Sequence, residues 1–135
     1  TRQMFGVRGA PGNTVNHATS YWVGNHSRRV FCDAVDVVSG IGYDKVDGDN
    51  PAFRFVDVRG VVTNLGVFDF GGPAHQMRAV SLHPGVSPDD VREATSFEVY
   101  GLSEAGPTRP ATPEELRLIR DVIDPKGLRD KEVRA

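Results

Sequence analysis

The residues with the clearest potential for chemistry lie in a glycine-rich stretch near the start of the sequence. Gly9 and Gly12 allow a ligand to approach the backbone closely, and backbone amides in such a stretch can donate hydrogen bonds to an oxyanion. Side chains that can donate hydrogen bonds follow directly, namely Asn13, Asn16, His17 and Thr19. This stretch is typical of a ligand-binding loop or of a tight structural loop with capping asparagines, and both interpretations stay open.

The other reactive side chains do not form a second motif. The four histidines are not at metal-ligand spacing and the lone Cys32 cannot complete a site, so no metal centre is predicted. Cys32 lies in strand-like sequence and is expected to be structural. His75 follows a Gly-Gly-Pro turn, and Ser39–Tyr43 is a flexible polar loop; each could contact a ligand or be a plain turn.

The length, charge and composition of the sequence limit the classes of function that this protein can have. The 135 residues fit one domain, and the net charge of −2 argues against a general nucleic-acid binder, which needs a basic surface. No apolar run has the length of a membrane span. Without a visible signal peptide or a disulfide framework, a cytoplasmic protein is expected. The sequence begins with Thr1, so we also consider a processed product or a fragment.

The residue pattern predicts many short strands and two helices. Loop is expected up to Gly24, after a short strand at the very start. The helices are expected from Ser87 to about Ala94 and from Thr112, which forms a capping box with Glu115, to about Asp124. Strand segments are expected within residues 29–38, 53–62 (broken near Gly60), 67–70, 77–83 and 97–100. We divide the sequence into an α/β core (1–111) and a C-terminal helix with a charged tail (112–135).

Two segments resemble the β subunits of class I CoA-transferases. Residues 61–70, VVTNLGVFDF, resemble the strand-turn-strand of those subunits, and residues 80–95, VSLHPGVSPDDVREAT, resemble the stretch that follows it. With the upstream glycine stretch, the resemblance covers about residues 3–99. It implies an α/β fold with an open, mostly parallel sheet of the CoA-transferase type, of which this sequence would be the C-terminal portion.

A narrower resemblance is to the β subunits of actinobacterial steroid ring-cleaving hydrolases, a branch of that family. It is carried by residues 9–22, 37–43 and 68–73. It implies an αβ assembly with the main acid–base residue on the α subunit, an upstream β segment as a further partner, and an acyl-CoA substrate without any cofactor. Substrate would then be bound by Gly9, Gly12, Asn13 and Thr19, with Asn16 and His17 as the catalytic candidates.

A departure from the transferase pattern favours one of the two branches. In transferases the catalytic glutamate lies in a Ser-Glu-Asn-Gly motif upstream of the glycine stretch, and this segment is either lost or part of another chain. In the glycine stretch itself, Pro11, Gly12 and Asn13 replace small apolar residues. The resemblance therefore favours a β-subunit component of a hydrolase that opens the last ring of a steroid-derived acyl-CoA in cholesterol catabolism. Two alternatives remain: a transferase that moves CoA between carboxylic acids, and a non-catalytic scaffold half of such an assembly.

Overall fold

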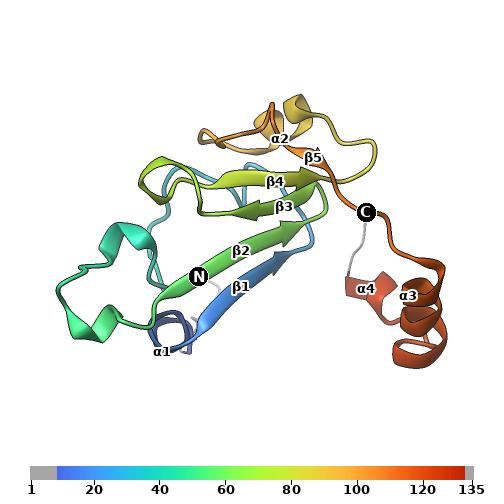
Figure 1. Cartoon of the computed structure of the whole chain (residues 1–135), viewed down its shortest axis with the longest axis horizontal. Coiled ribbons are helices and arrows are strands. Elements are labelled where there is room, and N and C mark those ends of the chain that lie inside the picture. Colours follow the sequence, from blue (N-terminus) through green and yellow to red (C-terminus); the bar gives the residue numbers. More distant parts are fainter. Residues whose placement is uncertain (1–8, 133–135) are drawn as a thin grey trace, which may run out of the picture.

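A five-stranded sheet is the centre of the computed structural model, which describes residues 9–132 (Figure 1). Its strands, in spatial order, are β1 (Ala18–Val23), β2 (Asp57–Thr63), β3 (Gly66–Asp69), β4 (Arg78–Leu82) and β5 (Gly106–Pro107). The β1–β2 and β4–β5 pairs are parallel, whereas β3 is antiparallel to both neighbours. Four strands therefore run in one direction, and the predicted α/β fold with an open, mostly parallel sheet is confirmed.

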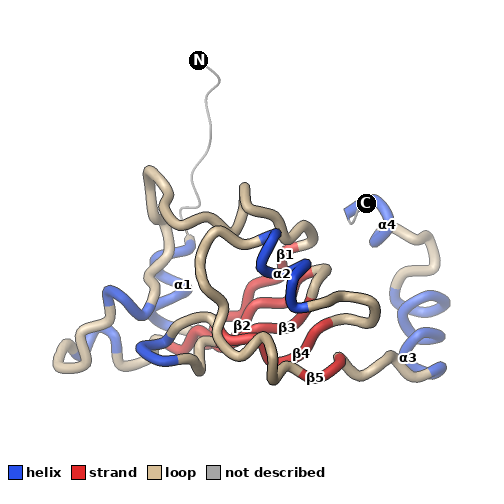
Figure 2. The backbone as a smooth tube through the Cα atoms, turned by 90° about the horizontal axis from the view of Figure 1, so that it is seen from above, coloured by secondary structure: helices blue, strands red, loops and turns tan. Residues whose placement is uncertain are grey.

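Short helices surround the sheet. They are α1 (Ala10–Asn16), α2 (Pro88–Ala94), α3 (Pro113–Arg117), which continues as the π-helical η4 (Leu118–Ile123), and α4 (Arg129–Glu132). Single 3-10 turns are η1 (Tyr43–Lys45), η2 (Pro51–Phe53) and η3 (Pro73–His75). In both views α2 lies over one face of the sheet, and α3 and α4 lie to one side (Figures 1 and 2). Within residues 9–132, no helix has the length and hydropathy needed to cross a membrane.

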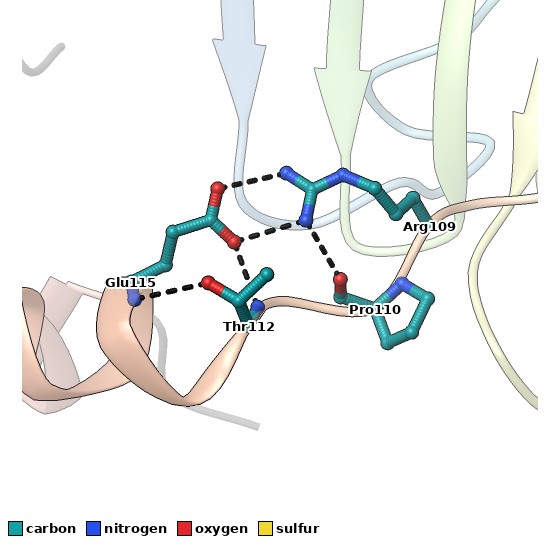
Figure 3. Close-up of polar contacts among 4 residues, drawn as sticks. All are labelled: Arg109, Pro110, Thr112 and Glu115. Atoms are coloured by element: carbon teal, nitrogen blue, oxygen red, sulfur yellow. Dashed lines mark hydrogen bonds and ion pairs between the residues drawn. The ribbon is translucent and has the colours of Figure 1, made fainter.

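The predicted helix starts at Ser87 and Thr112 are confirmed. Each hydroxyl accepts a hydrogen bond from the backbone amide three residues on, at 3.2 Å in both cases. At the second start, Glu115 also pairs with both terminal nitrogens of Arg109 (Figure 3). Arg109 is the main reason that the pKa of Glu115 falls to about 2. This ion pair ties the start of α3 to the linker that precedes it.

The hydrophobic core lies on one face of the sheet. Val61 pairs with Phe68, and Phe68 pairs with Ala79, so the three side chains share a face, which Val91 of α2 covers. Phe68 and Val91 are completely buried. On the other face, which carries Trp22 and Val62, the described residues leave 61% of Trp22 and 38% of Val62 exposed. Only one face of the sheet is therefore covered by this part of the protein.

The first described segment corrects one prediction. Residues 10–16 form α1 and residues 18–23 form β1, where loop was expected. Pro11 is compatible with the first helical turn, and the hydroxyl of Thr14 donates to Ala10 O at 2.9 Å within the helix. The strand expected at the very start, together with the rest of the glycine stretch before Gly9, lies outside the described residues.

Two predicted strands are wrong. Residues 29–38 contain turns and bends, since the amides of Val30 and Phe31 both donate to Ser27 O at 2.8 Å. Of these residues Phe31 enters the core, while Val37 and Val38 remain exposed. Within residues 97–100, Tyr100 alone makes an isolated bridge, to Arg78. Apolar β-branched residues were present in the first segment, but no neighbouring strand pairs with it in the described part of the chain.

The expected break near Gly60 is a bulge. β2 begins at Asp57, later than expected, and continues through Gly60, while its register against β1 shifts by one residue between Thr19 and Ser20. A Cβ atom at Gly60 would lie 2.8 Å from the carbonyl oxygen of Phe68, so the close approach of β3 requires glycine here.

A buried histidine joins the loop after β1 to the sheet and to α2. His26 Nε2 lies 2.9 Å from Thr95 Oγ1, and its Nδ1 lies 3.1 Å from Thr63 Oγ1. Because the Thr95 hydroxyl donates to Val91 O at 2.7 Å, it must accept from the imidazole, which places the proton on Nε2. The ring also stacks on Phe31 at a centroid distance of 3.8 Å. Burial lowers the pKa of His26 from 6.5 to about 4.

The lowered pKa of His26 predicts that the folded protein becomes less stable in acid. The unfolded chain binds a proton at His26 more readily than the folded one, so the free energy of unfolding should fall as the pH drops from 6.5 to about 4. The loss due to His26 should be at most about 3 kcal/mol. Denaturant unfolding across this range should give a flatter profile for His26→Gln, whereas His17→Gln, at an exposed histidine, should keep the slope. Equal slopes for wild type and His26→Gln would contradict the assignment.

Candidate functional site

A cleft of about 440 Å³ opens at the end of the sheet where β1 and β2 begin and β3 ends. Tyr21 of β1, Val58 of β2 and Phe70, directly after β3, form its sheet side. A hollow of similar volume beside residues 97–104 is made by that segment and Arg92 alone. The first cleft is the better candidate because segments far apart in the sequence converge on it.

The second wall of the cleft is the loop that leads into η1. The hydroxyl of Tyr43 accepts a hydrogen bond from Val58 N at 3.0 Å and donates to Val58 O at 3.2 Å. These two bonds attach the turn to β2 at a single residue. Val38, Gly40 and Ile41 of the same loop also line the cleft, so the position of this wall depends on the Tyr43 contact.

Helix α1 supports this loop from behind. The hydroxyl of Thr14, which is 1% exposed, accepts from the amide of Ile41 at 3.1 Å while it donates to Ala10 O. A methyl group at Gly40 would contact the Thr14 side chain at 3.5 Å, which shows how closely the loop passes the helix. The buried side of α1 therefore positions one wall of the cleft.

The third wall is the connection between β3 and β4, which an ion pair closes at its base. Arg78 donates to the two carboxylate oxygens of Asp69 at 2.9 and 2.5 Å. This guanidinium is the main cause of a pKa of Asp69 below the ordinary value. Inside the connection, Gly72 N donates to Gln76 O at 3.1 Å, which makes a narrow turn. The turn presents residues 73–75 to the cleft.

Two consecutive residues in this turn have a left-handed backbone. Ala74 has φ 51° and His75 has φ 61°, which is a strained conformation for residues other than glycine. Such strain is concentrated at functional sites, where the surrounding structure holds it in place. Here it sets the imidazole of His75 against the ring of Tyr43, with 4.1 Å between centroids and 14° between planes.

The chemistry of the cleft is mainly apolar. Its walls are aromatic and aliphatic, and its ionisable side chains besides the tyrosines are Asp44 and His75. None of the described residues that line it is a lysine or an arginine. Residues 9–132 also hold no group of three His, Cys, Asp or Glu side chains placed to bind a metal ion. The arrangement suits an apolar ligand with few hydrogen-bonding groups.

The residues singled out from the sequence lie next to this cleft but do not line it. They belong to α1 and its two ends, where Gly9, Gly12, Asn13, Asn16 and His17 are exposed. The backbone N–H of Asn13 donates to Gly9 O at 3.0 Å within α1, and the ligand-binding role of Asn13 stays a prediction. The Asn16 side chain donates to Gly12 O at 2.8 Å.

The remaining candidate is also engaged locally, since the Thr19 hydroxyl donates to His17 O at 3.0 Å. The structure brings Asn13, Asn16 and His17 together on one short helix and its C-cap. Sequence reasoning did not single out Thr14 or Tyr43. The polar loop 39–43 and the turn before His75 were nevertheless recognised as segments able to contact a ligand, and both line the cleft.

Comparison with known proteins places these features in a family context. No family model matches the chain. Over all 135 residues it is 76% identical to the cholesterol ring-cleaving hydrolase IpdB subunit of Mycobacterium tuberculosis, of which it covers 54%. The chain is homologous to IpdB subunits. It spans about half the length of the curated relatives it matches.

Solved structures agree with the sequence comparison. The crystal structure of IpdAB from Rhodococcus jostii RHA1 matches all of the chain with a TM-score of 0.94 and 68% identity, over 54% of the matched chain. Glutaconate CoA-transferase from Acidaminococcus fermentans matches 94% of the chain with a TM-score of 0.76 and 27% identity, over 48% of the matched chain. The predicted resemblance to CoA-transferase subunits, and to their ring-cleaving hydrolase branch, is confirmed.

The support of the cleft by α1 can be tested at Thr14. Thr14→Val keeps the shape of the side chain but removes the acceptor of the Ile41 amide, so hydrogen exchange at Ile41 should become about tenfold faster or more. Thr19→Val is the matched control, because its hydroxyl bonds only to the neighbouring His17 carbonyl. Unchanged exchange at Ile41 in Thr14→Val would show that α1 does not hold the loop.

Proposed function

We propose that this chain is part of the β subunit of a CoA-thioester hydrolase that opens the last ring of a steroid-derived acyl-CoA. The observation that carries the proposal is the 76% identity to an IpdB subunit over the whole chain. The fold match to an IpdAB structure supports it. An α subunit and the remaining half of the β subunit would complete the enzyme. We place it in the cytoplasm, where CoA thioesters are made and used.

The proposed reaction is a hydrolytic carbon–carbon cleavage. Water adds to a ring ketone that lies β to the thioester, and the bond between that carbon and the α carbon then breaks. The bonding electrons pass to the α carbon as a thioester enolate, which takes up a proton. The ring is thereby opened, and the single product carries a new carboxylate and still carries the CoA thioester. CoA enters only as part of the substrate, so no cofactor is required.

Within this scheme, the exposed side of α1 supplies hydrogen bonds. The side chains of Asn13 and His17 are exposed, whereas Thr14 faces the cleft loop. The side-chain amide of Asn13 can donate to the oxygen that becomes negatively charged, as donors in oxyanion holes do. Asn16 and His17 are further donors beside it, and the principal acid–base residue is expected on the α subunit. Gly9 and Gly12 leave this surface open for the approach of substrate.

A CoA-transferase is the second candidate, because the chain is 28% identical over 129 residues to one of the subunits of glutaconate CoA-transferase. That chemistry needs a covalent glutamyl-CoA intermediate on the complete assembly. The hydrolase proposal accounts better for the much higher identity to IpdB. The non-catalytic scaffold alternative predicts that the assembled protein turns over neither kind of substrate.

The reaction type can be determined on the complete αβ assembly that contains this chain. A bicyclic β-keto CoA thioester incubated in H₂¹⁸O should give a ring-opened acid with one ¹⁸O in its new carboxylate, as read by mass spectrometry. Hydroxylamine should trap no glutamyl hydroxamate. A trapped hydroxamate with transfer of CoA to an added carboxylic acid would instead establish the transferase, and no turnover at all would favour the scaffold.

The role of Asn13 can be measured on the same assembly. Asn13→Ala removes one donor to the developing oxyanion, so kcat should fall about 100-fold while KM changes little. Asn25→Ala changes another exposed asparagine, in the loop after β1, and should retain the wild-type rate. Normal turnover by Asn13→Ala would remove this residue from the mechanism.

A further inference from the structure

The described lining of the cleft lacks the cationic side chains that commonly bind the phosphates of CoA. Phosphate recognition relies on arginine, lysine or clustered backbone amides. No lysine or arginine is among the described residues that line the cleft, and its carboxylate, Asp44, is paired with Lys45 at 3.4 Å. The lining therefore offers no cationic side chain to the nucleotide end of the substrate, whereas the uncharged rings of the acyl group need none.

Its shape and walls suit a compact alicyclic group. A volume of about 440 Å³ is within the usual range for small-ligand pockets and leaves room for one or two fused rings. Tyr21, Tyr43 and Phe70 supply aromatic surface, and Ile41 and Val58 supply aliphatic surface. Burying a ring against such walls is favoured by roughly 25 cal/mol per Å² of apolar surface removed from water.

The cleft is also held in a fixed form before any ligand arrives. The Tyr43 hydroxyl is bonded to both the amide and the carbonyl of Val58, and Thr14 holds the Ile41 amide. Walls that are fixed in advance lose little conformational freedom on binding, which strengthens the binding of a rigid ligand.

The imidazole of His75 gives the cleft one polar group that can bind an oxygen on a ring. Stacking on Tyr43 uses the face of the His75 imidazole and leaves the nitrogens at its edge available for a hydrogen bond. The left-handed backbone at Ala74 and His75 fixes this orientation. An oxygen on the ring can therefore be recognised without a charged partner.

From these features we infer that the cleft between Tyr21, the Val38–Asp44 loop and His75 binds the alicyclic end of the acyl group, with His75 hydrogen-bonded to a ring oxygen. The inference rests on the proposed function. It adds the place where the ring is bound and identifies the acyl end as the end of the substrate that enters the cleft. The thioester would then extend away from the cleft, because the described lining offers no cationic side chain to the phosphates of CoA.

The test compares two CoA thioesters that are not substrates, so it does not depend on turnover. Cyclohexanecarbonyl-CoA carries a ring and acetyl-CoA does not, and calorimetry on the complete αβ assembly gives the Kd of each. The wild type should bind the ring-bearing thioester about tenfold more tightly or better. Val38→Trp should remove this preference by filling the cleft, since Val38 lines it.

Val37→Trp is the matched control. Val37 is 80% exposed and Val38 is 73% exposed, but of the two Val38 alone is among the described lining residues, so Val37→Trp should keep the preference. Native mass spectrometry confirms that both variants assemble. If Val38→Trp retains the preference, the inferred binding place is overturned even when the wild type opens rings. If the wild type opens no ring in the ¹⁸O experiment, the proposed function fails instead.

A second variant tests the polar contact. His75→Asn retains a side chain that tolerates the left-handed backbone but removes the imidazole. It should weaken binding of a CoA thioester with a ketone on its cyclohexane ring by about tenfold, while binding of cyclohexanecarbonyl-CoA should change less than about twofold. Equal effects on both thioesters would show that His75 only shapes the wall and does not bind the ring oxygen.

Discussion

The organisation of the sheet depends on the hydrogen bonds of one residue, Thr63. Its hydroxyl meets His26 Nδ1 and also accepts from the amides of Leu65 and Gly66, which closes the tight turn between β2 and β3. Its carbonyl accepts from His83 Nε2 at 2.9 Å. Thr63 is only 3% exposed, so each of these groups would be costly to leave unpaired. One side chain and its backbone thus bind the loop after β1, the β2–β3 turn and the end of β4.

Strand β2, which ends at Thr63, also reaches the cleft. Thr63 ends β2 in the core, and Val58, near the other end, donates one hydrogen bond to the Tyr43 hydroxyl and accepts one from it. A strand fixed in the core therefore gives the cleft loop a rigid attachment. The bulge opposite Thr19 and Ser20 lies between these two points and adjusts the register of β1, which carries Tyr21 into the cleft. Strand β2 consequently links the packing of the core to the geometry of the cleft.

Sequence signals that span only a few residues were sufficient to predict some of this structure. The caps at Ser87 and Thr112, and the strands on either side of the Asn64–Gly66 turn, are encoded within a few residues and were predicted. Helix α1 was missed because the glycines favoured a loop, whereas its stability depends on Thr14, whose partner Ile41 is 27 residues away. The cleft was missed for the same reason: its walls come from three segments, and only the fold shows that Tyr43 and His75 touch.

The exposed apolar surface argues for a chain that packs against further protein rather than for a self-sufficient domain. Trp22 and Val62 lie on an uncovered sheet face, and Ile119 and Ile123 of η4 are 41% and 75% exposed. Mostly parallel sheets are usually covered on both faces, so these surfaces call for a partner or for the remaining half of a subunit like IpdB. The exposed side of α1, with Asn13 and Asn16, is open to groups from elsewhere in the same way.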